Sequence, residues 1–249
     1  LFADPRIRRA VALAIDREAI VEGVLEGLGT VGTGPYTPSS WGFNPEVTPP
    51  PHDPEQAARL LAQAGCLLGE DGMRVRDGEP VGFTLLTNQG NVMREQTATI
   101  IQSQLKAVGI DVEIRIIAWT SLLAEYINKR KFDAVVMGWS TAVDPDAYVI
   151  WHSSQTGEHQ FNFVSYANDE VDAALEQARR IFDRGKRREH YHRIHAQIAA
   201  DLPYVFLFVP DSLPVVHRRV QNIHYSDKTG IGYQSIRWYV PEPFQKYAP

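Results

Sequence analysis

The chain has 249 residues, of which 44% are hydrophobic and 22% charged, enough for one large or two ordinary domains with a real core. A formal net charge of −5 with no basic stripe argues against nucleic acid as a partner. The single cysteine, Cys66, excludes an internal disulfide and a cysteine-based metal site, and no apolar run is long enough to span a membrane.

The amino-terminal residues predict two short helices. Asp4 is a good N-cap with Pro5 in the first turn, and Asp16 can cap a second helix that Gly27 and Gly29 end. The chain enters the first helix almost at once, with no signal peptide and no initiator methionine. We therefore expect it to be part of a longer protein.

Residues 30–53 are rich in proline and glycine and also contain aromatic residues that favour burial, so an ordered loop or crossover is expected. Asp53 and Pro54 then start another helix, which Gly65 ends. Residues 73–79 have the polar turn residues of a small exposed hairpin.

The clearest architecture lies in the middle of the chain. Apolar runs at 81–87, 110–117 and 132–137 predict strands. Helical patterns at 93–108 and 121–129 lie between them. This alternation predicts an α/β fold with a mainly parallel sheet, right-handed crossovers and flanking helices.

The carboxyl ends of the three strands point to one edge of the sheet, where open α/β sheets bind their ligands. The loops at that edge contain Asn88 and Gln89, then Trp119, and then Trp139. Flat apolar surface together with amide side chains suits a small polar or amphipathic ligand. One tryptophan alone is more often a core residue, but the three loops together favour a binding cleft.

The remaining residues predict two helices, one strand and a tail. Asn168 or Asp169 can cap the first helix, and the second runs from about 186 to 200. Residues 205–209 form an apolar strand pattern. Residues 210–249 are interrupted by prolines, rich in aromatic residues and without a regular pattern.

Few residues suggest catalysis. The chain has no nucleophile elbow, Walker loop or Rossmann glycine fingerprint. Asp144, Asp146 and His152 could imitate a hydrolase or metal site, but the proline between the two aspartates favours divergent side chains, so hydrolysis is a second hypothesis. His192 and His195 share a helix face and are better explained as surface or core residues than as a metal pair. No metal and no cofactor is expected.

Five segments, taken in order, resemble the carboxyl-terminal half of one family. This is the family of extracytoplasmic solute-binding proteins of dipeptide, oligopeptide and nickel ABC transporters, known as family 5. The segments are DPRIRRAVALAIDREAIVEGVL at 4–25, DPEQAARLLAQAG at 53–65, FDAVVMGWSTAVDPDAY at 132–148, NFVSYANDEVDAALEQAR at 162–179 and RREHYHRIHAQIAADLPYVFLF at 187–208.

The resemblance implies a two-lobed, periplasmic-binding-protein-like protein that closes on its ligand by hinge motion. Residues 1–200 would form the second ligand-binding lobe, and residues 201–249 a return segment that packs on a first lobe missing from this chain. It also implies a non-catalytic protein in the periplasm or lipid-anchored at the cell surface. Such a protein delivers a peptide or peptide-like solute to an ABC transporter permease.

The same resemblance implies that the loops at Asn88 and Trp139 face the ligand. Trp139 and Trp119 would supply stacking or apolar walls. Relatives bind peptides, nickel chelates, haem or oligosaccharides, so the family alone does not identify the ligand. The side chains expected to form hydrogen bonds with the ligand are Asn88, Gln89, Thr141, Asp144 and Asn162.

Two positions depart from the pattern of the peptide-binding relatives. Those relatives carry an aspartate three residues after the tryptophan, which holds the amino terminus of the ligand, and this position is Ala142 here. Some oligopeptide binders carry an arginine three residues before the tryptophan, and this position is Val136 here. Asp144 either takes over as the anchor or caps a helix that begins near Asp146, which is the commoner role of an aspartate before a proline. We expect that no charged amino terminus is held at position 142.

Overall fold

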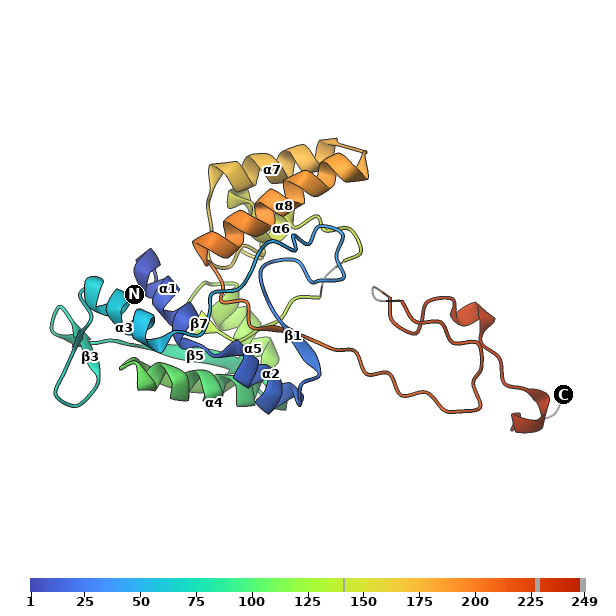
Figure 1. Ribbon diagram of the computed structural model, residues 1–249, viewed down its shortest axis with the longest axis horizontal. Helices are drawn as coiled ribbons and strands as arrows, with labels where there is room; N and C mark the ends of the chain where they lie inside the picture. Colours follow the sequence, from blue (N-terminus) through green and yellow to red (C-terminus); the bar gives the residue numbers. More distant parts are fainter. Residues whose placement is uncertain (141, 227–228, 247–249) are drawn as a thin grey trace. The chain divides into compact units, whose positions relative to one another are not determined.

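The computed structural model describes residues 1–140, 142–226 and 229–246 (Figure 1). The chain divides into two compact units, Leu1–Val209 and Pro210–Pro249. Residues 201–209 therefore belong to the first unit. The roles of the units as a second lobe and a return segment stay predictions.

Three capped helices begin the first unit, as the sequence predicts. The side chains of Asp4, Asp16 and Asp53 accept hydrogen bonds from backbone amides of the first turn, which satisfies donors that a helix leaves free. Ile7 and Leu13 of the first helix are fully buried. The helices are α1 (Pro5–Ala14), α2 (Arg17–Leu25) and α3 (Pro54–Gln63).

The central sheet has three parallel strands in the order β6-β5-β7. Because β5 lies in the middle and both neighbours run parallel to it, the predicted parallel sheet is confirmed. The third strand is shorter than the predicted 132–137. The strands are β5 (Gly82–Asn88), β6 (Asp111–Ile117) and β7 (Ala134–Val135).

Helical segments pack on both faces of this sheet (Figure 1). Leu85 points into the apolar cluster shared with α1, α3 and α4 (Val92–Ala107), whereas Leu86 points to the other face. On that face lie the short helix α5 (Trp119–Ser121) and the π-helical turn η1 (Leu122–Ile127). The sequence predicts an ordinary helix here, because a π-helical widening changes the backbone without changing the apolar pattern.

A second apolar cluster lies among three further helices. Trp151 and Tyr191 are buried in it, and the proline-rich loop contributes the buried Tyr36 and the half-buried Trp41 and Phe43. The expected ordered loop is therefore confirmed. In Figure 1, α7 and α8 lie side by side. The helices are α6 (Tyr148–Trp151), α7 (Asp169–Arg180) and α8 (Arg184–Asp201), and a 3-10 turn, η2 (Ser153–Gln155), follows α6.

Two further small sheets are present, one of three strands and one of two. The predicted hairpin is present, and a further strand pairs with it antiparallel. The apolar strand expected at 205–209 is shorter and pairs with a strand that follows α2. The hairpin sheet contains β2 (Leu67–Leu68), β3 (Arg74–Arg76) and β4 (Glu79–Pro80), and the two-stranded sheet contains β1 (Gly29–Val31) and β8 (Phe208–Pro210).

The second unit has little regular structure, as its sequence predicts. Its described residues form two isolated bridges, between Gln221 and Tyr239 and between Ser226 and Gly230. The aromatic side chains of Tyr239 and Phe244 are 57% and 62% exposed, so this unit leaves apolar surface uncovered. It contains two 3-10 turns, η3 (Ser235–Arg237) and η4 (Glu242–Phe244).

Candidate functional site

One arginine links the loops at the carboxyl edge of the sheet. Arg94 Nη1 donates a hydrogen bond of 2.6 Å to Asn88 Oδ1, directly at the end of β5. The guanidinium carbon of Arg94 lies 5.8 Å from the ring centroid of Trp119, at the end of β6. A Cβ added to Gly138, after β7, would lie 3.5 Å from Arg94 Nη2. The three strand ends therefore converge on one side chain, as the predicted topology requires.

Arg94 is a residue that the sequence analysis did not select. It lies in the first turn of α4, which begins after the N-cap Asn91. The positive end of the helix macrodipole disfavours a cation there, and burial lowers the pKa of Arg94. A cation held in an unfavourable place was the signal that could have identified it.

The aromatic part of this edge is larger than predicted. The Trp139 ring stacks on Phe163 with 5.6 Å between centroids and 9° between planes, and its edge contacts Phe161 at 5.9 Å. Trp139, Phe161 and Trp119 are 42%, 47% and 43% exposed. These side chains are held in place on one side and still present half of their surface to solvent. Such surfaces suit stacking or apolar contact with a ligand.

The predicted amide residues differ in how much of each side chain is free. Asn88 is buried, and its Nδ2 donates to Gln89 O at 3.2 Å. Gln89 has an exposed side chain, while its backbone amide donates to Ile117 O at 2.8 Å. The exposed Gln89 side chain forms no hydrogen bond with another described residue, and its contact with a ligand stays a prediction, whereas Asn88 positions Arg94. Thr141 lies outside the described residues.

Asn162 has its hydrogen-bonding capacity filled within its own loop. Its Nδ2 donates to His152 O at 3.1 Å and to Tyr166 O at 2.8 Å, and its Oδ1 accepts from Tyr166 N at 2.9 Å. The side chain is completely buried. In this structure Asn162 shapes the loop that carries Phe161 and Phe163, and its contact with a ligand stays a prediction.

Asp144 forms an ion pair that the sequence did not suggest. Arg187 of α8 donates to both carboxylate oxygens, with distances of 3.0 and 2.8 Å. Arg187 also donates to Tyr191 Oη at 2.7 Å, and its guanidinium lies 5.2 Å from the Trp41 ring centroid. Asp144 Oδ1 further accepts from the backbone amide of Asp146 at 3.1 Å, which forms the turn before α6. Asp144 therefore stabilises its loop but does not cap the next helix as expected, because α6 begins at Tyr148 and its N-cap Ala147 has no side-chain hydrogen bond.

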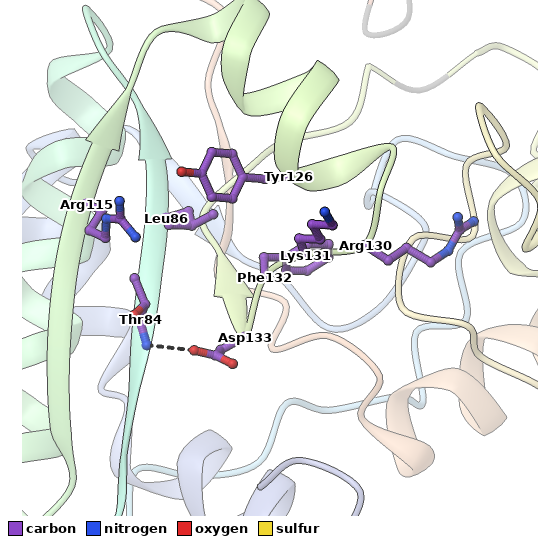
Figure 2. A pocket seen from close by; sticks show the side chains of 8 residues that line it. All are labelled: Thr84, Leu86, Arg115, Tyr126, Arg130, Lys131, Phe132 and Asp133. Atoms are coloured by element: carbon purple, nitrogen blue, oxygen red, sulfur yellow. Dashed lines mark hydrogen bonds between the residues drawn. The ribbon is translucent and has the colours of Figure 1, made fainter.

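A separate hollow of about 440 Å³ lies on the η1 face of the sheet, beside β5 and the residues that precede β7 (Figure 2). Three cations line it together with the Asp133 carboxylate, which accepts from Thr84 N at 3.0 Å. None of the residues expected to contact a ligand is among those that line it. The lining residues are Thr84, Leu86, Arg115, Tyr126, Arg130, Lys131, Phe132 and Asp133.

Residues 1–160 match the model of the bacterial extracellular solute-binding proteins, family 5 Middle. The chain belongs to this family. Its fold is the α/β, periplasmic-binding-protein-like fold of the solved family 5 structures, so the resemblance read from the five segments is confirmed.

Two family 5 proteins illustrate the similarity. The oligopeptide-binding protein AppA of Bacillus subtilis is 38% identical over 245 residues, which cover 96% of this chain and 45% of AppA. Its structure with a nonapeptide matches with a TM-score of 0.83, over 96% of this chain and 48% of that one. The oligopeptide-binding protein of Thermus thermophilus with a pentapeptide matches with a TM-score of 0.80 at 27% identity, over 95% and 43%. The chain therefore spans about half the length of the relatives it matches.

The hydrolase hypothesis has no support in this family or in the geometry. Asp144 is occupied by its ion pair, and Asp146 Oδ2 accepts from Arg179 Nε at 2.8 Å. His152 Nε2 lies 3.5 Å from Glu176 Oε1, so the three side chains have different partners. Among the described residues, no group of three or more histidine, cysteine, aspartate or glutamate side chains could hold a metal ion. Within the same residues, no helix is both long enough and apolar enough to cross a bilayer.

Proposed function

We propose that this chain is the second ligand-binding lobe of a solute-capture protein that delivers peptides or peptide-like molecules to an ABC importer. The observation that carries the proposal is the convergence of three strand-end loops, with half-exposed Trp119 and Trp139, at the open edge of the sheet. The proposal is supported by the alignment of 96% of the chain with an oligopeptide-binding protein at 38% identity. Residues 201–249 would be the return segment toward the first lobe.

Capture by this site requires no chemical step. Hinge closure of two lobes around a ligand excludes bulk water, and bridging waters can adapt the polar groups to different side chains. Trp139 on its Phe163 support would form one wall of the cleft. We infer a non-catalytic protein, because recognition and release are sufficient for transport.

The location of the whole protein and its partners belong to the same proposal. Family 5 consists of extracellular solute-binding proteins, which favours a place outside the cytoplasm. Either the periplasm or a lipid anchor at the cell surface would bring the captured solute to the permease of an ABC transporter. Mass spectrometry of molecules that copurify with the intact two-lobed protein would identify the solute.

Truncation of Trp139 tests the proposed site. In the intact protein, Trp139→Ala should weaken peptide binding by about 1–3 kcal/mol, since it removes a stacked aromatic anchor from the cleft. Isothermal titration calorimetry with a peptide identified by mass spectrometry measures the loss. The matched control is Phe182→Ala, because Phe182 lies between α7 and α8, is fully exposed and is not among the rings that contact Trp139. Equal affinities of wild type and Trp139→Ala would exclude this wall.

A further inference from the structure

The carboxylates of the loop after β7 are neutralised within the chain. Asp144 is paired with Arg187 and Asp146 with Arg179, and both pairs have N–O distances of 2.8 Å. Position 142 carries an alanine and no charge. The loop that follows Trp139 therefore offers no unpaired acidic side chain to a ligand ammonium group among its described residues.

Arg94 is in the opposite situation. Its Nη1 is bound to the neutral Asn88 amide, and its Nη2 and Nε have no hydrogen bond to any described residue. No carboxylate of the described chain forms an ion pair with it, and the side chain is partly buried. Desolvation of a charge without a counter-charge costs free energy, whereas a bidentate carboxylate offsets that cost. The structure thus holds a cation in place without supplying its anion.

The surroundings of Arg94 define where such an anion would bind. Asn88 fixes one edge of the guanidinium plane, and the Trp119 ring covers it at 5.8 Å. The backbone at Gly138 lies next to Nη2. A group bound to the free edge would contact all three strand-end loops. It would also lie near the amino end of α4, whose backbone dipoles favour negative charge.

We propose that Arg94 binds a carboxylate of the captured ligand, so that this lobe selects anionic peptides. The proposal rests on the function proposed above and names its ligand class. The carboxylate comes either from the carboxyl terminus of the peptide or from an acidic side chain, and both have the same recognition chemistry. The recognised group of the ligand would then be an anion bound by α4, and not an ammonium group bound in the loop after β7.

Three peptides test the proposal in the intact protein. All have an acetylated amino terminus and the same core sequence. One has an amidated carboxyl terminus, one a free carboxyl terminus, and one an amidated terminus with a single internal glutamate. At least one anionic peptide should bind about tenfold more tightly than the neutral one, and the preferred peptide identifies the source of the carboxylate.

Variants then assign this preference to Arg94. Arg94→Gln should abolish the preference for the anionic peptide, and Arg94→Lys should reduce it. Arg59→Gln is the matched control, because it removes the same charge from an exposed position on α3. A preference of equal size in Arg94→Gln, or no preference in the wild type, would overturn the proposal.

A titration with glutarate tests the anion site independently of peptides. In intact protein labelled with 5-fluorotryptophan, the fluorine signal of Trp119, assigned with Trp119→Phe, should shift with glutarate but not with sodium chloride at equal ionic strength. The shift should be absent from Arg94→Gln. If Arg94→Gln does not fold, the wild-type shift decides. No shift would contradict the anion site, whereas a shift without binding of any peptide would refute only the peptide function.

Discussion

At the scale of single residues, Asp144 and Arg94 lie at the same edge of the sheet, but only Asp144 has an oppositely charged partner among the described residues. Asp144 lies in a polar loop beside Trp139, yet both of its oxygens are held by Arg187. Arg94 lies in a helix and was not expected to matter, yet it has no carboxylate partner among the described residues. The expectation that no charged amino terminus is held at position 142 agrees with this distribution and stays a prediction until peptides are compared.

His195 shows how a buried histidine can stabilise a loop as a neutral side chain. It is completely buried between α8 and the proline-rich loop. Its Nδ1 accepts from Asn44 N at 3.0 Å, so Nε2 carries the proton and donates to Thr33 Oγ1 at 3.1 Å. Gly34 packs so closely on the ring that an added Cβ would clash with His195 Cδ2. Burial, the largest cause, lowers the pKa of His195 to about 4.

This lowered pKa predicts a loss of stability in mild acid. Above the unfolded pKa of about 6.5, His195 is neutral in both states and contributes no pH dependence. Between about 6.5 and 4 the unfolded chain binds a proton that the folded chain does not, so the free energy of unfolding should fall by about 2 kcal/mol from pH 7 to pH 5. Urea unfolding at both pH values measures it.

His195→Gln should remove this part of the pH dependence. NMR titration of the ring would measure the pKa of His195 directly. A His195 pKa near the ordinary histidine value of about 6.5 would contradict the predicted loss of stability.

At the scale of elements, Arg74 connects the carboxyl ends of two helices. It is buried in the small hairpin sheet, with Nε donating to Val108 O and Nη1 to Cys66 O, both at 2.7 Å. Val108 is the C-cap of α4, and Cys66 follows the end of α3. A cation at helix carboxyl ends is favoured by both macrodipoles and satisfies carbonyls that the helices leave free. The hairpin therefore fixes how these two helices pack.

Arg74→Met should destabilise the protein by about 2–4 kcal/mol, because it leaves two buried carbonyl groups without donors. Urea unfolding of the variant and the wild type measures this difference. Arg76→Met is the control on the same strand. Among the described residues, Arg76 forms one ion pair, with the exposed Asp77 at 3.8 Å, so its loss should change stability by less than about 0.5 kcal/mol. Equal effects of the two substitutions would show that Arg74 has no special role.

At the scale of the whole molecule, a two-lobed cleft would be open in a chain with one lobe. The first unit has its own sheet and three apolar clusters, which supports independent folding. Residues 210–249 carry apolar side chains that we expect to be loose, self-packed or covered in an oligomer. Of these, Tyr239 and Phe244 are exposed, Trp238 is half-buried and Tyr247 lies outside the described residues.

The 249-residue chain should therefore fold and bind the ligand of the intact protein at least about tenfold more weakly, which corresponds to about 1.4 kcal/mol. The reason is that half of the proposed cleft is missing, and no hinge closure can exclude water. Circular dichroism tests folding, and calorimetry of both proteins with the same peptide tests binding. Equal affinities would show that one lobe holds the complete site.

The sequence by itself determined the starts of the helices, the parallel sheet and the edge where its loops meet. Aspartates at positions 4, 16 and 53 predict helix starts, because an N-cap side chain binds backbone amides of the helix's own first turn. Strand–helix alternation is likewise a local pattern, and its geometric consequence brings Asn88, Trp119 and Trp139 to one edge. Trp119 and Trp139 were predicted from the sequence as aromatic residues of this edge, whereas Phe161 and Phe163, which contact Trp139, were not.

Only the tertiary structure decided which polar groups at this edge are free. Asp144 and Arg187 are 43 residues apart, and no periodic pattern links them. Asn162 has the residue type of a ligand contact, but its amide is filled by the loop around it. Arg94 has the residue type of a solvated helix surface, yet it lies where three strands end. Whether a hydrogen-bonding group is available depends on partners brought together by folding, and this information is not contained in local sequence.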